Sequence, residues 1–245
     1  AAGEESDAAR YRITKKEDAD AILAKCRGAA PSSVRDETKP TSEIAPRLFD
    51  LTTLQREANK KYKLSAADTL KIAQSLYEHH KVATYPRTDA TALPEDYVEP
   101  AKQVLADFSG TKYEAHAQRA LRSDWVRPNK RIFDNAKISD HFAIIPTGVK
   151  PSGLTEAEEA IYDMIVRRFI AAFYPAAEYQ QTVRITTVVG EQFRSSGRVM
   201  QLEGWKAVYG ALIVIILLIE PLGLGKLYGN IRDYLMVWPF DQFKK

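Results

Sequence analysis

The pattern of apolar and polar residues predicts a helical centre for this chain. Residues 154–175 carry apolar side chains at i, i+3 and i+4 spacing, which predicts an amphipathic helix. Thr155 is expected to cap this helix, and Pro175 lies beyond its end. Its apolar stripe consists of Ile161, Met164, Ile165, Phe169 and Phe173.

Two shorter helices and an extended segment are predicted earlier in the chain. The stretch "TTLQ" indicates a helix from about Thr52 to Tyr62, and Ser65 is expected to cap a second helix that runs to about His80. The short extended piece "KVATY" follows directly. Two helices, a tight turn and an extended piece together outline a helix-turn-helix with a wing.

Further helices and a long loop are expected around this centre. Helices are predicted to begin near Pro94 and over residues 111–121, whereas residues 122–150 are predicted to be mostly loop. Near the start, "TKKE" is a capping box at Thr14, for a helix that should end near Gly28.

Alternation replaces the helical pattern after Pro175. The stretches "EYQQTVRITTVVG" and "EQFRSSGRVMQL" predict two strands joined by a turn near Gly190. The polar segment 31–46 is either an extended strand or a connector. The nine apolar residues 211–219 are too short to cross a bilayer core of roughly 30 Å as a helix, so they predict a buried strand. The pattern as a whole predicts an α+β chain.

Composition is that of a globular protein and limits the chemistry. The 245 residues are 45% hydrophobic and carry a net charge of +3, so any surface for nucleic acid must be local. The single cysteine, Cys26, excludes an internal disulfide and fits a reducing compartment. Four scattered histidines show no zinc-ligand spacing, and no glycine loop of the phosphate-binding kind indicates use of ATP.

The stretch "KVATYPRTDA" holds the strongest candidate for chemistry, Tyr85. A free phenol has a pKa near 10, so it needs a nearby positive charge or base to act as a nucleophile. In an extended segment Arg87 lies on the same side as Tyr85, and a guanidinium neutralises charge on a phosphate. The pair suits attack on a phosphodiester, although an ordinary surface turn has the same residues more often.

Two other groups of residues are candidates for contact with a phosphate backbone. His141, in "ISDHFAIIPT", is either a phosphate-contacting or proton-transferring group or a histidine at the end of a buried strand. In the segment that precedes His141, basic side chains are interspersed with aromatic ones. This mixture is typical of a groove that binds single-stranded nucleic acid and equally of a solvated loop. The candidates for DNA binding are Arg119, Arg122, Trp125, Arg127, Lys130 and Arg131.

Four segments in order resemble the type IA DNA topoisomerases. "LFDLTTLQREANKKYKLSAADTLKIAQSLYEHHKVATYPRTDATALPEDY" resembles their active-tyrosine region, and "ISDHFAIIPT" resembles their second motif as found in the topoisomerase III branch. "LTEAEEAIYDMIVRRFIAAFYPAAEYQQT" and "FRSSGRVMQLEGWKAVYG" follow in the same order. The resemblance covers roughly residues 11–210.

This resemblance implies a reaction and a set of site residues. Such enzymes cut one DNA strand through a transient 5′-phosphotyrosine, pass a strand and reseal the break without ATP. Tyr85 falls on the nucleophile and Arg87 on the arginine that stabilises the scissile phosphate. His141 falls on the histidine that contacts the DNA phosphate. Thr88 and Asp89 complete the signature and are expected at the DNA.

The resemblance also implies a domain organisation within the toroid of this family. Residues 1–27 would be a helical piece of the outer domain, and 28–46 with 176–210 would form the β-rich gate domain. Residues 47–175 would form the mainly helical, winged-helix-like tyrosine domain, and 211–245 are unassigned, with a return to the gate and outer domains as one option.

The chain is expected to be a fragment that lacks the family's Toprim domain. That domain supplies the acidic cluster for Mg²⁺, so no metal ligand is expected in this chain and Mg²⁺ belongs to the full-length enzyme. We expect the isolated fragment to bind single-stranded DNA weakly without relaxing DNA, as a monomer in the cytoplasm and away from membranes. Two alternatives remain, a tyrosine recombinase and a non-catalytic helix-turn-helix module that binds DNA.

Overall fold

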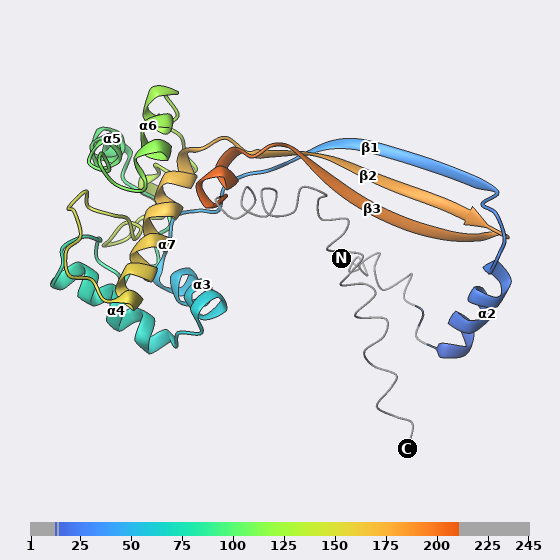
Figure 1. The fold of residues 1–245 in the computed structure, drawn as a ribbon. Helices are drawn as coiled ribbons and strands as arrows, with labels where there is room; N and C mark the ends of the chain where they lie inside the picture. The colour runs from blue at the N-terminus through green and yellow to red at the C-terminus, as the bar shows by residue number, and fades with distance from the viewer. Residues whose placement is uncertain (1–12, 14, 211–245) are drawn as a thin grey trace, which may run out of the picture. The chain divides into compact units, whose positions relative to one another are not determined.

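The computed structural model describes residues 13 and 15–210, which fall into two compact units (Figure 1). The strand unit combines the described residues up to Ser42 with Glu178–Leu202. The helical unit combines Glu43–Ala177 with the described residues from Glu203 onward. The α+β class predicted from the sequence is confirmed.

The strand unit contains one helix and a three-stranded sheet of order β1-β2-β3 (Figure 1). Strands β1 (Ser33–Glu43), β2 (Ala177–Val188) and β3 (Glu191–Leu202) are accompanied by helix α2 (Lys16–Cys26). The antiparallel β2–β3 pair is closed by a two-residue turn in which both residues have positive φ, which matches the right-handed twist of a hairpin. The hairpin near Gly190 is therefore confirmed, and the polar segment after Pro31 is a strand.

The start of α2 differs from the sequence prediction. Lys15 occupies the N-cap position and makes no side-chain hydrogen bond to the helix. The capping box was predicted to begin at Thr14, which lies outside the described residues, as does the strand predicted over 211–219. Across residues 15–210 no helix is long and apolar enough to cross a membrane.

The helical unit is built around helix α7 (Glu156–Phe173), which the other helices surround (Figure 1). Thr155 and Glu158 form the predicted capping box at its start. Every residue of the predicted apolar stripe is buried, and Arg168 is buried beside it at 5% exposure. Because α7 is covered on most sides, its apolar surface is wider than a single stripe.

Further helices of the helical unit pack against α7 or beside it. They are α3 (Leu51–Tyr62), α4 (Ala66–Glu78), α5 (Val98–Ala106) and α6 (Glu114–Arg122), with short 3-10 turns η1 (Glu95–Tyr97), η2 (Asn135–Lys137) and η3 (Gly204–Tyr209). Helices α4 and α6 and the turn η3 contact α7 directly, and α3 packs on α4.

The caps explain where sequence and structure agree on these helices. Ser65 caps α4 as predicted, by accepting a hydrogen bond from the backbone N–H of Asp68. The helix predicted from about Thr52 begins one residue earlier, at Leu51, because Asp50 is the N-cap and forms a capping box with Thr53. Both Asp50 and Thr52 are good capping residues, so composition alone does not choose between them.

Extended segments from distant parts of the chain pair beside the helices. Single β-bridges join Phe49 to Ile144 and Ala83 to Pro146. The segment "KVATY", predicted as a wing after the second helix, therefore pairs with the chain that follows His141. This pairing brings the two motif regions of the sequence together.

Candidate active site around Tyr85

Thr84 fixes the backbone next to Tyr85. Its backbone N–H donates to the Ile145 carbonyl at 2.9 Å. Its hydroxyl donates to the Ala143 carbonyl at 3.0 Å and accepts from the Ile145 N–H at 2.9 Å. Three hydrogen bonds on one residue hold the tyrosine segment against residues 143–145, so Tyr85 and His141 are neighbours because of backbone pairing.

The ring of Tyr85 packs between two other rings. The centroids of Tyr85 and His141 lie 4.3 Å apart with a tilt of 42° between the ring planes. Tyr77, from α4, presents its ring edge-on to Tyr85 at 5.5 Å. Tyr85 is half-buried and His141 is exposed. No hydrogen bond joins the Tyr85 hydroxyl to another group within residues 15–210.

Arg87 carries a positive charge that no carboxylate in the described part of the chain neutralises. Its side chain is exposed, and Nη2 donates to the side-chain amide oxygen Oε1 of Gln74 on α4 at 3.4 Å. A guanidinium has five N–H donors, so most of its donors remain available for an anion. Gln74 orients this arginine without reducing its charge.

Thr88 and Asp89 make contacts within the protein. Thr88 is 7% exposed. Its hydroxyl donates to the His141 carbonyl at 3.0 Å and accepts from the Ala90 N–H at 3.1 Å. Asp89 is exposed and accepts a hydrogen bond from the Ser139 hydroxyl at 3.3 Å. Both residues therefore tie the tyrosine segment to the histidine segment.

Four of the six residues predicted as a basic and aromatic groove lie together. Trp125, Arg127 and Arg131 line one cavity of about 380 Å³, and the Arg119 guanidinium lies 5.8 Å from the centre of the Trp125 ring. Lys130 instead forms an ion pair of 2.6 Å with Glu95.

The remaining member, Arg122, is exposed at the end of α6 and does not line the cavity. Burial is the main reason that the pKa of Arg131 is lowered from its usual value, and the positive charge of Arg47 adds to the effect. The sequence prediction grouped all six residues because it counted charge along the chain, whereas the cavity selects by three-dimensional position.

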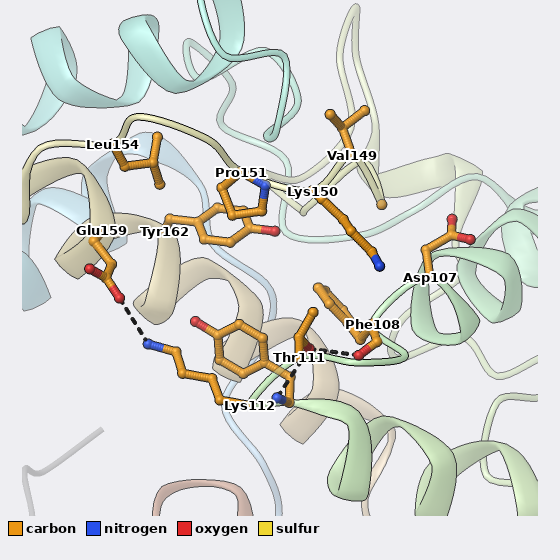
Figure 2. Close-up of a pocket in the computed structure, with 12 residues that line it drawn as sticks. Asp107, Phe108, Thr111, Lys112, Val149, Lys150, Pro151, Leu154, Glu159 and Tyr162 are labelled. Atoms are coloured by element: carbon orange, nitrogen blue, oxygen red, sulfur yellow. Dashed lines mark hydrogen bonds and ion pairs between the residues drawn. The ribbon is translucent and has the colours of Figure 1, made fainter.

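A second cavity, of about 320 Å³, was not foreseen (Figure 2). Gly148 forms part of its wall with φ of +87°, and a Cβ there would lie 2.5 Å from Asp107 Oδ2. Figure 2 shows Lys112 paired with Glu159 and the Lys150 ammonium pointing into the cavity. Two cations and two carboxylates thus balance one another. No sequence motif predicted this cavity, because its lining combines two loops with helix α7.

Two residues of the site itself were also missed. Thr84 stands directly before Tyr85, and its threefold bonding depends on a partner segment about 60 residues away. Gln74 was part of a helix whose polar face carried no distinctive signal. Among residues 15–210 there is no group of three or more His, Cys, Asp or Glu side chains that could hold a metal ion.

Comparison with known proteins identifies the family. The profile of the DNA topoisomerase family matches residues 2–213. DNA topoisomerase 3 of Bacillus cereus is 41% identical over 200 residues, which cover 81% of this chain and 27% of that protein. DNA topoisomerase 3 of Bacillus licheniformis is 42% identical over 182 residues, which cover 73% of this chain and 25% of that protein. The chain thus spans about a quarter of the length of these relatives.

A solved structure shows the same fold at lower identity. The full-length topoisomerase I from Thermotoga maritima is 21% identical, with a TM-score of 0.57 over 82% of this chain and 32% of that chain. The chain belongs to the DNA topoisomerase family, and within it to the type IA enzymes of the topoisomerase III branch.

Proposed function

We propose that this chain carries the nucleophilic half of a topoisomerase active site that cleaves and reseals one DNA strand. The observation that supports the proposal best is the packing of the half-buried Tyr85 phenol on the exposed His141 imidazole, with ring centroids 4.3 Å apart. A ligand can reach both groups at once. Arg87, which has no carboxylate partner in the described residues, supplies positive charge beside them.

The proposed reaction exchanges one phosphate ester for another. The Tyr85 oxygen forms a bond to phosphorus and gives up its proton, while the bond from phosphorus to the 3′ oxygen breaks. The 3′ oxygen takes up a proton and leaves as a hydroxyl, and the 5′ phosphate remains on Tyr85. Resealing reverses each step, so the phosphotyrosine conserves the ester bond and no ATP is consumed.

Each neighbouring residue has a part in this scheme. Arg87 binds the phosphate oxygens and stabilises the negative charge of the crowded intermediate. His141 donates a hydrogen bond to the same phosphate from its exposed ring. Thr88 acts as a positioning residue, because its hydroxyl is occupied by the His141 carbonyl and the Ala90 N–H. Asp89 holds the adjoining turn through Ser139.

The rest of the enzyme supplies what the described residues lack. In this proposal a Toprim domain would provide the acid for the leaving oxygen and the carboxylates for Mg²⁺. We propose single-stranded DNA as the partner, bound by a monomer in the cytoplasm.

We keep the domain assignment made from the sequence as part of this proposal. Residues 1–27 belong to the outer domain, and 28–46 with 176–210 form the gate. Residues 47–175 form the winged-helix-like tyrosine domain. The polar β1 and the β2–β3 hairpin within one three-stranded sheet support a gate assembled from both segments.

Two alternatives predict different products. A tyrosine recombinase would leave the phosphate at a 3′ end, and a non-catalytic module would form no covalent bond. The helix pair α3–α4 suits DNA binding of either kind. In a tyrosine recombinase the histidines normally precede the tyrosine, whereas Tyr85 precedes His141 in this chain. A non-catalytic module gives no reason for an exposed histidine against the tyrosine ring.

A chimera separates these possibilities. Residues 11–210 would replace the aligned segment of the Bacillus cereus relative, and the chimera would be incubated with an end-labelled single-stranded oligonucleotide. We expect a denaturation-resistant adduct through the 5′ phosphate of the fragment downstream of the cut, lost in Tyr85→Phe and kept in Tyr77→Phe, the matched neighbour. A 3′ adduct, or an adduct that survives Tyr85→Phe, overturns the proposal.

A further inference from the structure

The cavity around Trp125, which we call the tryptophan pocket, has the chemistry of a nucleotide site. It has a volume of about 380 Å³, within the range of small-ligand sites. Among its twelve lining residues are the aromatic Trp125, Phe173 and Tyr174 and the arginines Arg127 and Arg131. Two of these residues are arginines, three are aromatic and none is acidic, so the pocket favours an anion with a flat apolar part.

We propose that the tryptophan pocket binds one unpaired nucleotide of single-stranded DNA, with its base against Trp125 and its phosphate on Arg131 and Arg127. Tyr85, Arg87 and His141 do not line this pocket. It would therefore be a second contact for the DNA strand, outside the cleavage site. This inference rests on the proposed function in one respect, which is that single-stranded DNA is the partner.

Arg131 supports the phosphate end of this assignment. Its Nη2 is buried and has no hydrogen-bond partner, and its Nη1 makes only a long contact of 3.5 Å to the Ala172 carbonyl. A buried charged donor without a partner is costly, and a phosphate oxygen would satisfy it. Arg127 is exposed at the same cavity, and no ion pair within the described ranges neutralises it.

Trp125 supports the base end. Its indole is half-buried, with the Tyr174 ring edge-on at 4.6 Å and the Arg119 guanidinium 5.8 Å from its centre. The ring is thereby held in one orientation while part of its surface remains accessible. Stacking on a fixed aromatic ring is how proteins bind single-stranded bases with little preference for sequence.

The cavity shown in Figure 2 provides a useful contrast. Lys112 and Lys150 line it together with Asp107 and Glu159, and Lys112 is already paired with Glu159 at 3.3 Å. Charge there is balanced, so a phosphate gains little. The two cavities are similar in volume, so the difference in charge is the reason to assign the nucleotide to the tryptophan pocket.

Fluorescence anisotropy tests the inference. It measures the affinity of the chain for a labelled ten-residue oligothymidylate over a range of salt concentrations. We expect Trp125→Leu to weaken binding at least fivefold. Arg127→Gln should lower the slope of log affinity against log salt by about 0.7, the value for one phosphate contact on a single strand. Lys150→Gln, which removes one charge from the other cavity, should leave the slope unchanged.

An abasic oligonucleotide of the same length separates contact from a structural effect. With the bases absent, Trp125→Leu and the unaltered chain should bind equally, because only stacking is lost. Persistence of the fivefold difference on the abasic strand overturns the assignment of a base to Trp125. If Trp125→Leu and Arg127→Gln both bind the oligothymidylate as tightly as the unaltered chain does, the assignment of the tryptophan pocket as a nucleotide site is overturned.

The two proposals fail separately. If the pocket variants lose binding as expected while the chimera forms no adduct, the assignment of Tyr85 is wrong and the tryptophan pocket stands. If the chimera forms the adduct on Tyr85 and the pocket variants bind normally, only the further inference is wrong.

Discussion

Replacement of Thr88 by valine should reduce activity without removing a group that we propose to contact DNA. Valine keeps the shape of the side chain and removes its hydroxyl, which joins the His141 carbonyl to the Ala90 N–H. Ala90 is 2% exposed, so water cannot replace the lost acceptor. An unsatisfied buried N–H costs about 1–3 kcal/mol. For a chain of this size 2 kcal/mol corresponds to a fall of about 4–8 °C in Tm.

The effect on chemistry should exceed the effect on stability. His141 loses a hydrogen bond that holds its backbone beside Tyr85, and small misplacements of reacting groups reduce rates by up to about a hundredfold. We expect adduct formation by the chimera to fall about tenfold or more in Thr88→Val, at a temperature at which the protein remains folded.

Thr88→Ser is the matched control. Serine keeps the hydroxyl and loses one methyl group, which costs about 1 kcal/mol of stability. Its adduct formation should remain near that of the unaltered protein. Equal rates for the valine and serine variants, with both folded, would refute the argument that the hydroxyl positions His141.

Two further predictions concern the stability of the helical unit. The Ser75 hydroxyl, and after it the Thr155 N–H, lower the pKa of Glu158 to about 2, so Glu158 stabilises the fold above its unfolded value of 4.5 and this contribution disappears as the pH falls towards 2. Glu158→Gln should therefore reduce the dependence of the free energy of unfolding on pH between 4.5 and about 2. An unchanged dependence would contradict this role of Glu158. Glu57→Gln, which removes the carboxylate that accepts from Nη2 of the buried Arg168 through both oxygens, should cost about 1.5–3 kcal/mol in urea denaturation. Glu99→Gln, on an exposed pair, should cost under about 1 kcal/mol, and equal losses would contradict the reasoning.

The sequence was most informative where local signals were strong. Helix α7 has an apolar stripe and a capping box, and the β2–β3 hairpin has alternation on both sides of Gly190. Helix α3 begins at Leu51, one residue before the predicted start at about Thr52, because the N-cap is Asp50. Helix α6 begins at Glu114 and not at residue 111, because the loop before it makes its own turns.

The site was predictable in part from motif order, whereas its geometry was not. Tyr85 and His141 were both singled out, but 56 positions separate them along the chain. Their contact depends on bridges such as Ala83 to Pro146, which have no local signature. The same reason hid the role of Thr84, because a threonine that bonds a distant backbone looks like any other threonine.

The attachment point of DNA tests the central claim most directly. After cleavage by the chimera, nuclease and protease digestion followed by mass spectrometry would locate the residual nucleotide. The account predicts a 5′-phosphate on the hydroxyl of Tyr85, within the peptide that contains "TYPRTD". A nucleotide on any other residue, Tyr77 included, or one joined through its 3′ phosphate, would contradict it.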